Sequence, residues 1–228
     1  MEYRKLTQEE IDKELSLASD YYTSNGEIGR PANFAFCDLR DLDFGKLLLR
    51  DVTFEGALLE GVRLRGTFLG CDFANSEMSG AVLNGTFEQC DFFRAKLESC
   101  HILNAEFSRT VLVETNLKDA YGRTTYFDKC IMCNSNFENA KLQQATITFC
   151  NLDNCVFDNA LMPDAMFENN KMYDVDLSGS LINPQNFINN RISNDAFKNA
   201  SIATKREKEQ RDNVWILWCK FALRKLFA

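Results

Sequence analysis

The sequence predicts an all-β solenoid, a rod made by stacking one short repeat, with a helical segment at each end. From Phe92 to Ile202 a large apolar residue stands at every fifth position, and Gly122 is the one exception. A second row, two residues upstream, holds small residues such as Cys90 and Ala95. A helix repeats every 3.6 residues and a strand every two, so neither produces this spacing, whereas a short fixed repeat indicates a solenoid.

The units themselves have a characteristic sequence. Examples are Cys71-Asp72-Phe73, Ala95-Lys96-Leu97, Thr115-Asn116-Leu117 and Cys150-Asn151-Leu152. They resemble the pentapeptide-repeat family, whose unit is A(D/N)LXX, over about three quarters of the chain. The resemblance implies a right-handed quadrilateral β-helix with four pentapeptides to a coil. In that fold the large central residue and the small residue two positions before it point inward.

The repeat extends toward the N-terminus and gives 35 units, or about nine coils, over residues 31–203. Two junctions, Leu64 to Phe68 and Leu83 to Phe87, are one residue short. We expect flattened corners or small bulges at these junctions rather than domain boundaries.

Gly122 leaves a gap in one layer of the predicted core, between Ile102 and Leu142. Two interpretations stay open. Either Tyr121 or Tyr126 turns inward and fills the space, or the gap forms a small-molecule pocket.

Residues 1–30 predict a helical cap. Thr7 and Glu10 have the spacing of a capping box, in which each residue satisfies a backbone N–H near the start of the helix. One apolar face follows, made of Ile11, Leu15, Ala18 and Tyr22. The expected role of this helix is to cover the open edge of the first coil, because an exposed backbone ladder invites aggregation.

Residues 204–228 predict an amphipathic C-terminal helix that contains both tryptophans of the chain. Most of its circumference is apolar, and a polar stripe includes Lys220 and Arg224. So large an exposed patch is rare on a monomer. We expect a homodimer contact here, and the alternatives are binding to a membrane surface or simple capping of the last coil. The expected contact residues are Trp215, Leu217, Trp218, Phe221 and Phe227.

Charge is distributed unevenly. The chain has a net charge of −7, with about −8 on residues 31–202 and about +4 on the segment after them. Phosphate binding demands a basic surface, so the acidic rod argues against direct binding of nucleic acid. The N-terminus has no apolar secretory signal, which predicts a cytoplasmic protein. Seven of the nine cysteines occupy the small inward position and are expected to be buried thiols.

The sequence contains no recognisable catalytic, cofactor-binding or metal-binding motif. The single histidine, His101, is expected at an outward position without a partner for catalysis. Cys130 and Cys133 have the spacing of a redox or zinc motif, but the repeat points one inward and the other outward. We therefore expect no enzyme activity and no cofactor.

Five acidic residues fall on one predicted face of five successive coils. They are Glu98, Asp119, Glu138, Asp158 and Asp176. Stacked like charges repel, which is a cost that a purely structural surface would avoid. A column of carboxylates could stand in for the phosphates of DNA, and the alternative is a chance alignment in an acidic repeat.

The family resemblance also implies a function. Its quinolone-resistance members are acidic dimeric rods that bind DNA gyrase or topoisomerase IV as DNA mimics, and this chain is similar in length, acidity and its apolar C-terminal segment. We therefore expect a non-enzymatic protein-binding rod of this kind. The alternative is an interaction scaffold or bacterial effector that binds a host protein or a membrane surface.

Overall fold

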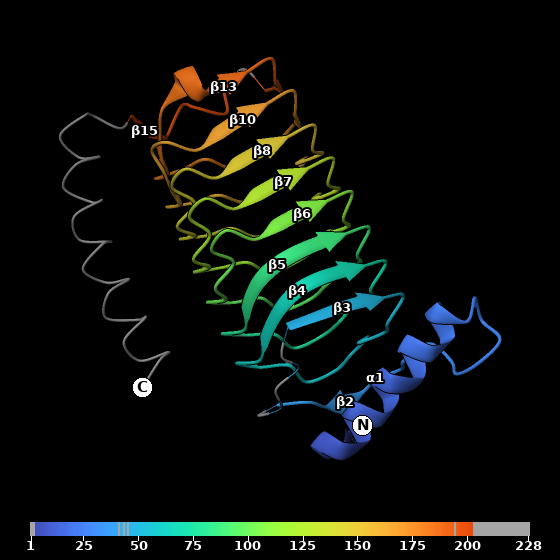
Figure 1. Ribbon diagram of the computed structural model, residues 1–228. Helices are drawn as coiled ribbons and strands as arrows, with labels where there is room; N and C mark the ends of the chain where they lie inside the picture. Colours follow the sequence, from blue (N-terminus) through green and yellow to red (C-terminus); the bar gives the residue numbers. More distant parts are fainter. Residues whose placement is uncertain (1–2, 41, 43, 45, 194, 203–228) are drawn as a thin grey trace.

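The computed structural model describes residues 3–40, 42, 44, 46–193 and 195–202. These residues form a right-handed β-solenoid of about eight turns, with a helix beside its N-terminal end (Figure 1). The count is close to the nine coils expected from 35 repeats. The prediction of the fold is confirmed.

Eight parallel strands, one from each turn, form the longest sheet (Figure 1). In spatial order they are β3 (Lys46–Arg50), β4 (Arg63–Leu69), β5 (Val82–Glu88), β6 (Glu106–Ser108), β7 (Tyr126–Asp128), β8 (Thr146–Thr148), β10 (Met166–Glu168) and β13 (Phe187–Ile188). A second sheet contains β9 (Leu161–Met162), β12 (Leu181–Ile182) and β15 (Ser201–Ile202). A third pairs β11 (Lys171–Met172) with β14 (Arg191–Ile192), and the short 3₁₀ helix η1 spans Pro184–Asn186.

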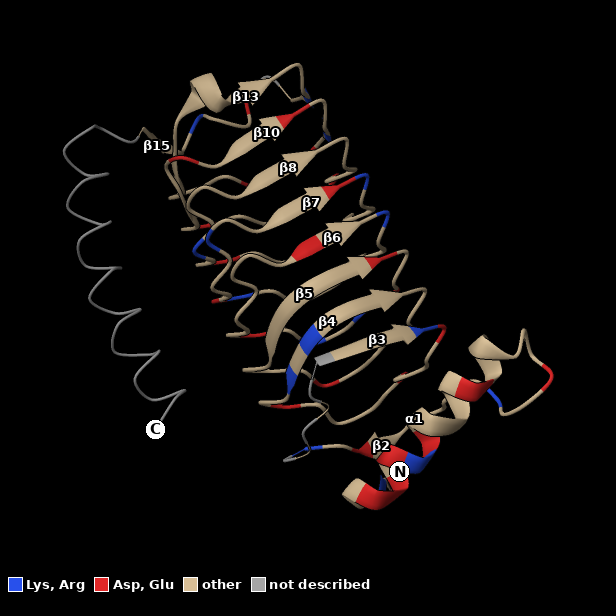
Figure 2. Ribbon diagram, viewed as in Figure 1, with Lys and Arg blue, Asp and Glu red and all other residues tan. Residues whose placement is uncertain are grey.

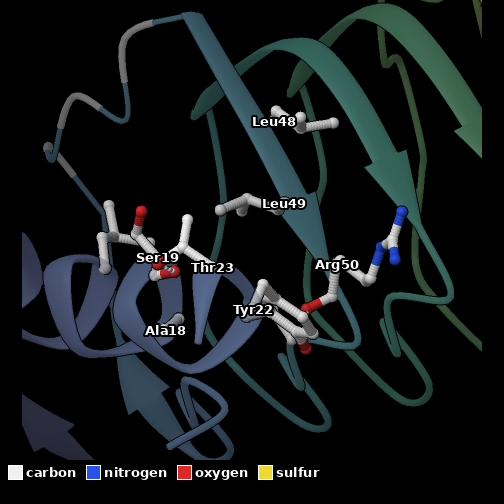
Figure 3. A pocket seen from close by; sticks show the side chains of 9 residues that line it. Ala18, Ser19, Tyr22, Thr23, Leu48, Leu49 and Arg50 are labelled. Carbon is white, nitrogen blue, oxygen red and sulfur yellow. Dashed lines mark hydrogen bonds between the residues drawn. The ribbon is translucent and has the colours of Figure 1, made fainter. Parts of the chain in front are cut away.

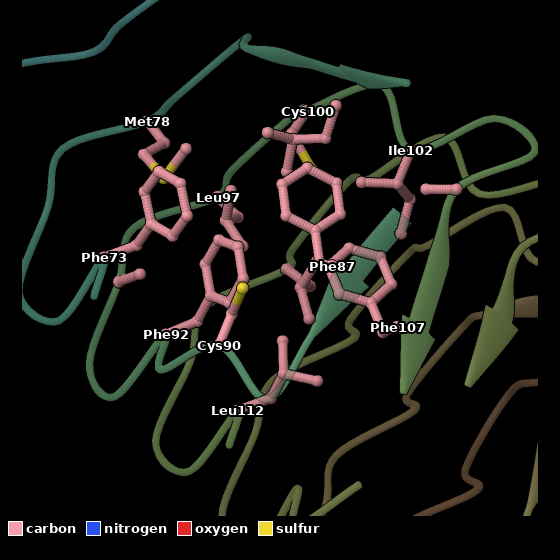
Figure 4. Close-up of a cluster of buried hydrophobic side chains, with 14 of the residues drawn as sticks. Phe73, Met78, Phe87, Cys90, Phe92, Leu97, Cys100, Ile102, Phe107 and Leu112 are labelled. Atoms are coloured by element: carbon pink, nitrogen blue, oxygen red, sulfur yellow. The ribbon is translucent and has the colours of Figure 1, made fainter. Parts of the chain in front are cut away.

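The central residues of the repeats fill the interior in stacked layers. On the long sheet, Phe107 lies between Phe87 and Phe127, with ring centroids 5.1 and 5.0 Å away. Phe73 and Phe92 stack in the same way at 4.7 Å (Figure 4). All five rings are fully buried. Each turn therefore rests on its neighbours, and stability accumulates along the rod.

The two short junctions form flattened corners, as predicted. Strands β4 and β5 are seven residues long and continue through the corner that other turns make. Here Leu47, Gly66 and Gly85 stack directly, 19 residues apart. A Cβ atom on Gly66 would lie 2.0 Å from the Leu47 carbonyl oxygen, and one on Gly85 would lie 2.2 Å from that of Gly66. The shortened turns thus require glycine at both positions.

The predicted filling of the Gly122 layer by a tyrosine is wrong. Tyr126 is exposed, and Tyr121 stacks on His101 at the surface. A Cβ atom at Gly122 would lie 2.8 Å from the Leu142 Cδ2 atom and 3.1 Å from the Ile102 Cδ1 atom. The larger side chains of the adjacent turns therefore close over the glycine, and the position next to it has no room for a ligand.

The N-terminal helix α1 (Gln8–Thr23) begins at the predicted capping box. The Thr7 backbone N–H donates to the Glu10 carboxylate at 2.8 Å, and the Glu10 N–H donates to the Thr7 hydroxyl at 3.3 Å. The Thr7 backbone N–H and the Thr7 hydroxyl both donate to the Glu10 carboxylate, and these two bonds lower the pKa of Glu10. Ile11 and Ala18 are buried in the solenoid core, as the pattern predicts.

One element of the N-terminal region was not predicted. Strand β1 (Arg4–Lys5) pairs in parallel with β2 (Cys37–Asp38) and adds one strand below the first turn. Two residues are too few for a periodic signal, so only the folded chain reveals this pairing.

All seven cysteines predicted to point inward are buried thiols, and Cys133 is partly exposed. Burial raises the pKa of the Cys100 thiol, so this group stays protonated. Within the described ranges, no helix has the length and apolar character that crossing a membrane needs. The predicted C-terminal helix and its contact residues Trp215, Leu217, Trp218, Phe221 and Phe227 lie outside the described residues.

Candidate functional site

One face of the solenoid carries one acidic residue in each of eight successive turns. Its backbone ladder is continuous, running from Asp38 through Glu77 and Lys96 to Asp176 by parallel bridges. We call the outward side of this ladder the acidic face. Its acidic residues are Asp38, Glu60, Glu77, Glu98, Asp119, Glu138, Asp158 and Asp176.

The five predicted residues all lie on the acidic face, but they do not form one straight column. Glu98, Glu138 and Asp158 each follow a buried central residue directly. Asp119 stands one position later, at a corner, with φ of 58°. Asp176 precedes its central residue. The prediction of a single column is therefore wrong, because Asp119 and Asp176 occupy other positions of the repeat than the remaining three, although the backbone register stays constant at 20 residues.

Basic residues neutralise the acidic face in part. The Lys118 ammonium lies 2.9 Å from the Glu138 carboxylate, and Lys96 lies 2.6 Å from Glu77. The hydrogen bonds to these carboxylates raise the pKa of both lysines. Lys118 thus stands among the acidic residues in the middle of the face and neutralises Glu138.

At the N-terminal end of the face, Arg40 contacts Asp38. The guanidinium lies 2.8 Å from the Asp38 carboxylate, and hydrogen bonds from Arg40 lower the pKa of Asp38 to about 2. Glu98 instead accepts hydrogen bonds from Asn116 at 2.6 Å and from Ser79 at 3.0 Å. These uncharged donors hold the carboxylate in place but do not neutralise its negative charge.

The charge that remains is concentrated in the later turns. Among the residues that the structure describes, Asp119, Asp158 and Asp176 have no Lys or Arg within ion-pair distance. The Asp176 carboxylate accepts a hydrogen bond from the Ser178 backbone N–H at 2.9 Å. Together with Glu98, these three carboxylates are the strongest candidates for contact with a basic partner.

Sequence reasoning missed three members of the acidic face. Asp38, Glu60 and Glu77 lie in the turns before and at the shortened junctions, where the ladder advances by 19 or 20 residues. Counting back along the sequence in fixed steps of 20 residues therefore misses the positions that lie on the face. Counting by 19 across the two junctions would have placed all three residues on the face.

A separate cleft lies at the N-terminal end, between α1 and β3 (Figure 3). It has a volume of about 350 Å³ and a mainly apolar lining that includes Leu15, Leu49 and Val52. The Tyr22 hydroxyl donates to the Arg50 carbonyl at 2.5 Å. The described residues of the lining include no carboxylate, histidine or cysteine, and so they do not supply the groups of an acid–base or nucleophilic site.

His101 lies at an outward position, as predicted, and is half-buried. Its ring stacks on Tyr121 with centroids 5.0 Å apart, and burial lowers its pKa. Over the described part of the chain, no three His, Cys, Asp or Glu residues come together in a way that could hold a metal ion.

Comparisons with known proteins agree with this architecture. The pentapeptide-repeat model matches eight copies, over residues 32–66, 90–121 and 125–159. No curated protein sequence matches the chain. The repeats and the solenoid that they build show that the chain belongs to the pentapeptide-repeat family.

Several solved structures are similar. HetL, a pentapeptide repeat protein involved in heterocyst differentiation regulation in the cyanobacterium Nostoc sp. strain PCC 7120, is 17% identical, with 71% of this chain and 80% of HetL covered and a TM-score of 0.37. QnrB1, a plasmid-mediated fluoroquinolone resistance protein, is 16% identical, with coverage of 69% and 86% and a TM-score of 0.41. Rfr23 from the cyanobacterium Cyanothece 51142 is 19% identical, with coverage of 66% and 91% and a TM-score of 0.24.

Proposed function

We propose that this chain is a non-enzymatic, cytoplasmic protein-binding rod whose acidic face occupies a basic, DNA-binding surface of another protein. The observation that supports the proposal is the regular placement of one acidic residue in each of eight successive turns. A face of this kind offers no chemistry for catalysis, but it offers charge at a fixed spacing.

The spacing of the charges suits mimicry of one DNA strand. Stacked turns are about 4.8 Å apart, so the face presents an acidic residue about every 4.8 Å. One strand of B-DNA presents a phosphate about every 3.4 Å along the axis. Arg40, Lys96 and Lys118 pair with four of the acidic residues, which are Asp38, Glu60, Glu77 and Glu138. The mimicry is therefore strongest in the later turns.

The specific partner that we propose is a type II topoisomerase, DNA gyrase or topoisomerase IV. These enzymes hold a DNA duplex on a basic surface, which an acidic rod could occupy. Opposite charges on the two surfaces would steer the encounter and fix its register. A protein bound in this way would modulate the enzyme or protect it from a quinolone.

The test is a supercoiling assay with purified DNA gyrase and a decatenation assay with topoisomerase IV, each with and without a quinolone. The wild-type protein should change enzyme activity or quinolone sensitivity in a concentration-dependent manner. The double variant Glu138→Lys/Asp158→Lys should need at least about tenfold more protein for the same effect, because like charges then face each other.

A matched control keeps the net charge change and moves it to another face. Glu106→Lys/Glu168→Lys alters one exposed and one half-buried carboxylate, on β6 and β10 of the long sheet, and this variant should act like the wild type. If the wild-type protein leaves both enzymes unaffected, the topoisomerase proposal fails. That result would favour the alternative, an interaction scaffold or effector with another partner.

A further inference from the structure

A second face of the solenoid differs from the acidic face in what its outward positions hold. Its ladder runs from Val82 through His101, Tyr121 and Lys141 to β9, and continues into β12 and β15. We call the outward side of this ladder the β12 face. Between residues 63 and 144 its outward positions contain Arg63, Arg65, Arg123 and Lys141 but no Asp or Glu.

Several outward residues on the β12 face are buried. Leu181 stands at the outward position before a central residue, yet it is only 5% exposed. Ile131 occupies the same position of the repeat on another face and is 48% exposed. Gln143 and Pro163, which each follow a central residue, are buried as well. Thr148, at an outward position of the long sheet, is buried too, and there its hydroxyl contacts Tyr126 and Asp128 of the adjacent turn. Leu181 differs because it is buried at the position before a central residue, where no other described residue of the repeat is buried.

The N-terminal helix does not account for this burial. Helix α1 lies at the opposite end of the rod, beside β3 (Figure 1). The Gln143 side-chain oxygen is buried and accepts no hydrogen bond from the residues that the structure describes. A buried carbonyl oxygen without a donor is costly, so the covering group is expected to bring one.

The described chain ends on this same face. Its last residue, Ile202, belongs to β15, which pairs with β12. The 26 residues that follow, 203–228, include an apolar stretch from Val214 to Phe227. As a helix, this segment would be about 39 Å long. Eight stacked turns span about 34 Å, so the segment could cover the whole face.

We propose that residues 203–228 bind along the β12 face of their own chain, with the apolar side of the segment on Pro163 and Leu181. The connection favours the same chain over a second copy, because the segment starts at the edge of the face that it would cover. The contact removes an apolar strip from solvent and leaves the acidic face open.

The two tryptophans of the chain, Trp215 and Trp218, both lie in this segment and give a direct readout. In the full-length wild-type protein their emission should be blue-shifted and poorly quenched by acrylamide. Leu181→Asp places a charge under the segment, so the emission should shift to the red and the quenching should increase. Leu161→Asp, at the same position of the repeat one turn earlier, should have the same effect.

Ile131→Asp is the matched control. It makes the same kind of change at the equivalent position of an uncovered face, so tryptophan emission should stay as in the wild type. Thermal melts of all three variants show whether the solenoid is intact. Red-shifted, fully quenched tryptophans in the wild type, or an emission that Leu181→Asp leaves unchanged, would overturn the proposal.

Dilution and light scattering distinguish binding within one chain from binding to a second copy or to a membrane. The proposal expects a mass near 26.1 kDa and a blue shift that does not depend on protein concentration. A dimer whose blue shift disappears on dilution would assign the segment to a second copy. A blue shift that appears only after addition of anionic phospholipid vesicles would assign it to a membrane surface. Either of these results would contradict the proposal.

Discussion

The acidic face and the β12 face have the same inward architecture and opposite outward character. On both, the central residue of each repeat points into a continuous core, as Phe137 does on one face and Ile182 on the other. The acidic face presents a carboxylate in every turn, whereas the outward positions of the β12 face between residues 63 and 144 include cations but no Asp or Glu. Figure 2 marks the acidic and basic residues along the ribbon. The core therefore determines the rod, and the outward positions are free to give each face its own binding chemistry.

The largest expected effect comes from a change that damages both faces at once. Phe107→Ala removes a ring that is packed between Phe87 and Phe127. The change should lower the free energy of unfolding by about 3–5 kcal/mol, because a cavity remains in the middle of the stack. Urea denaturation followed by circular dichroism would measure this.

The control for this change is Phe149→Ala. Phe149 is 57% exposed at a corner, so its removal should alter stability by no more than about 0.5 kcal/mol. Equal losses for the two variants would show that the stacked interior is not what supports the faces.

A smaller effect is expected from the ion pair that divides the acidic face. A double-mutant cycle with Lys118→Ala and Glu138→Ala should give a coupling energy of about 0.2–1 kcal/mol, because both side chains are partly exposed. The coupling should decrease as salt is added. A coupling of several kcal/mol would mean that the pair is a structural element of the face.

The smallest effect is a pH dependence at the N-terminal end of the acidic face. Arg40 lowers the pKa of Asp38 to about 2, whereas the carboxyl of an unfolded chain titrates near 3.9. The folded state thus favours the ionised form. This contribution is fully present above about pH 4 and is lost as the pH falls toward 2.

The comparison variant for this dependence is Arg40→Gln. Its stability should lie slightly below that of the wild type at pH 6, and the two should converge near pH 2. Thermal melts across this range would measure the difference. Curves that stay parallel down to pH 2 would contradict the assigned cause.

Much of the fold could be predicted because its signals are local. The period of five identified the inward residues, and the spacing of Thr7 and Glu10 identified the start of α1. The two short junctions predicted flattened corners because a turn with one residue fewer cannot keep the regular corner geometry of its neighbours. Each of these inferences needs only neighbouring residues.

The failures of prediction involve relations between turns. The gap at Gly122 closes because Ile102 and Leu142 approach from the layers on either side. The acidic column is broken because Asp119 stands one position later in the repeat, which leaves Lys118 aligned between Glu98 and Glu138. The burial of Leu181 has no signal in the repeat, since the position is outward.

The sequence by itself determined the repeat, the identity of the core residues and the uneven distribution of charge. These properties follow from the size and charge of side chains at a fixed spacing, and the sequence gives all three directly. The tertiary structure alone decided which acidic residues are neutralised, how the layer at Gly122 closes and which outward positions are covered. Those outcomes depend on distances between residues about 20 positions apart, and only the stacking of one turn on the next determines these distances.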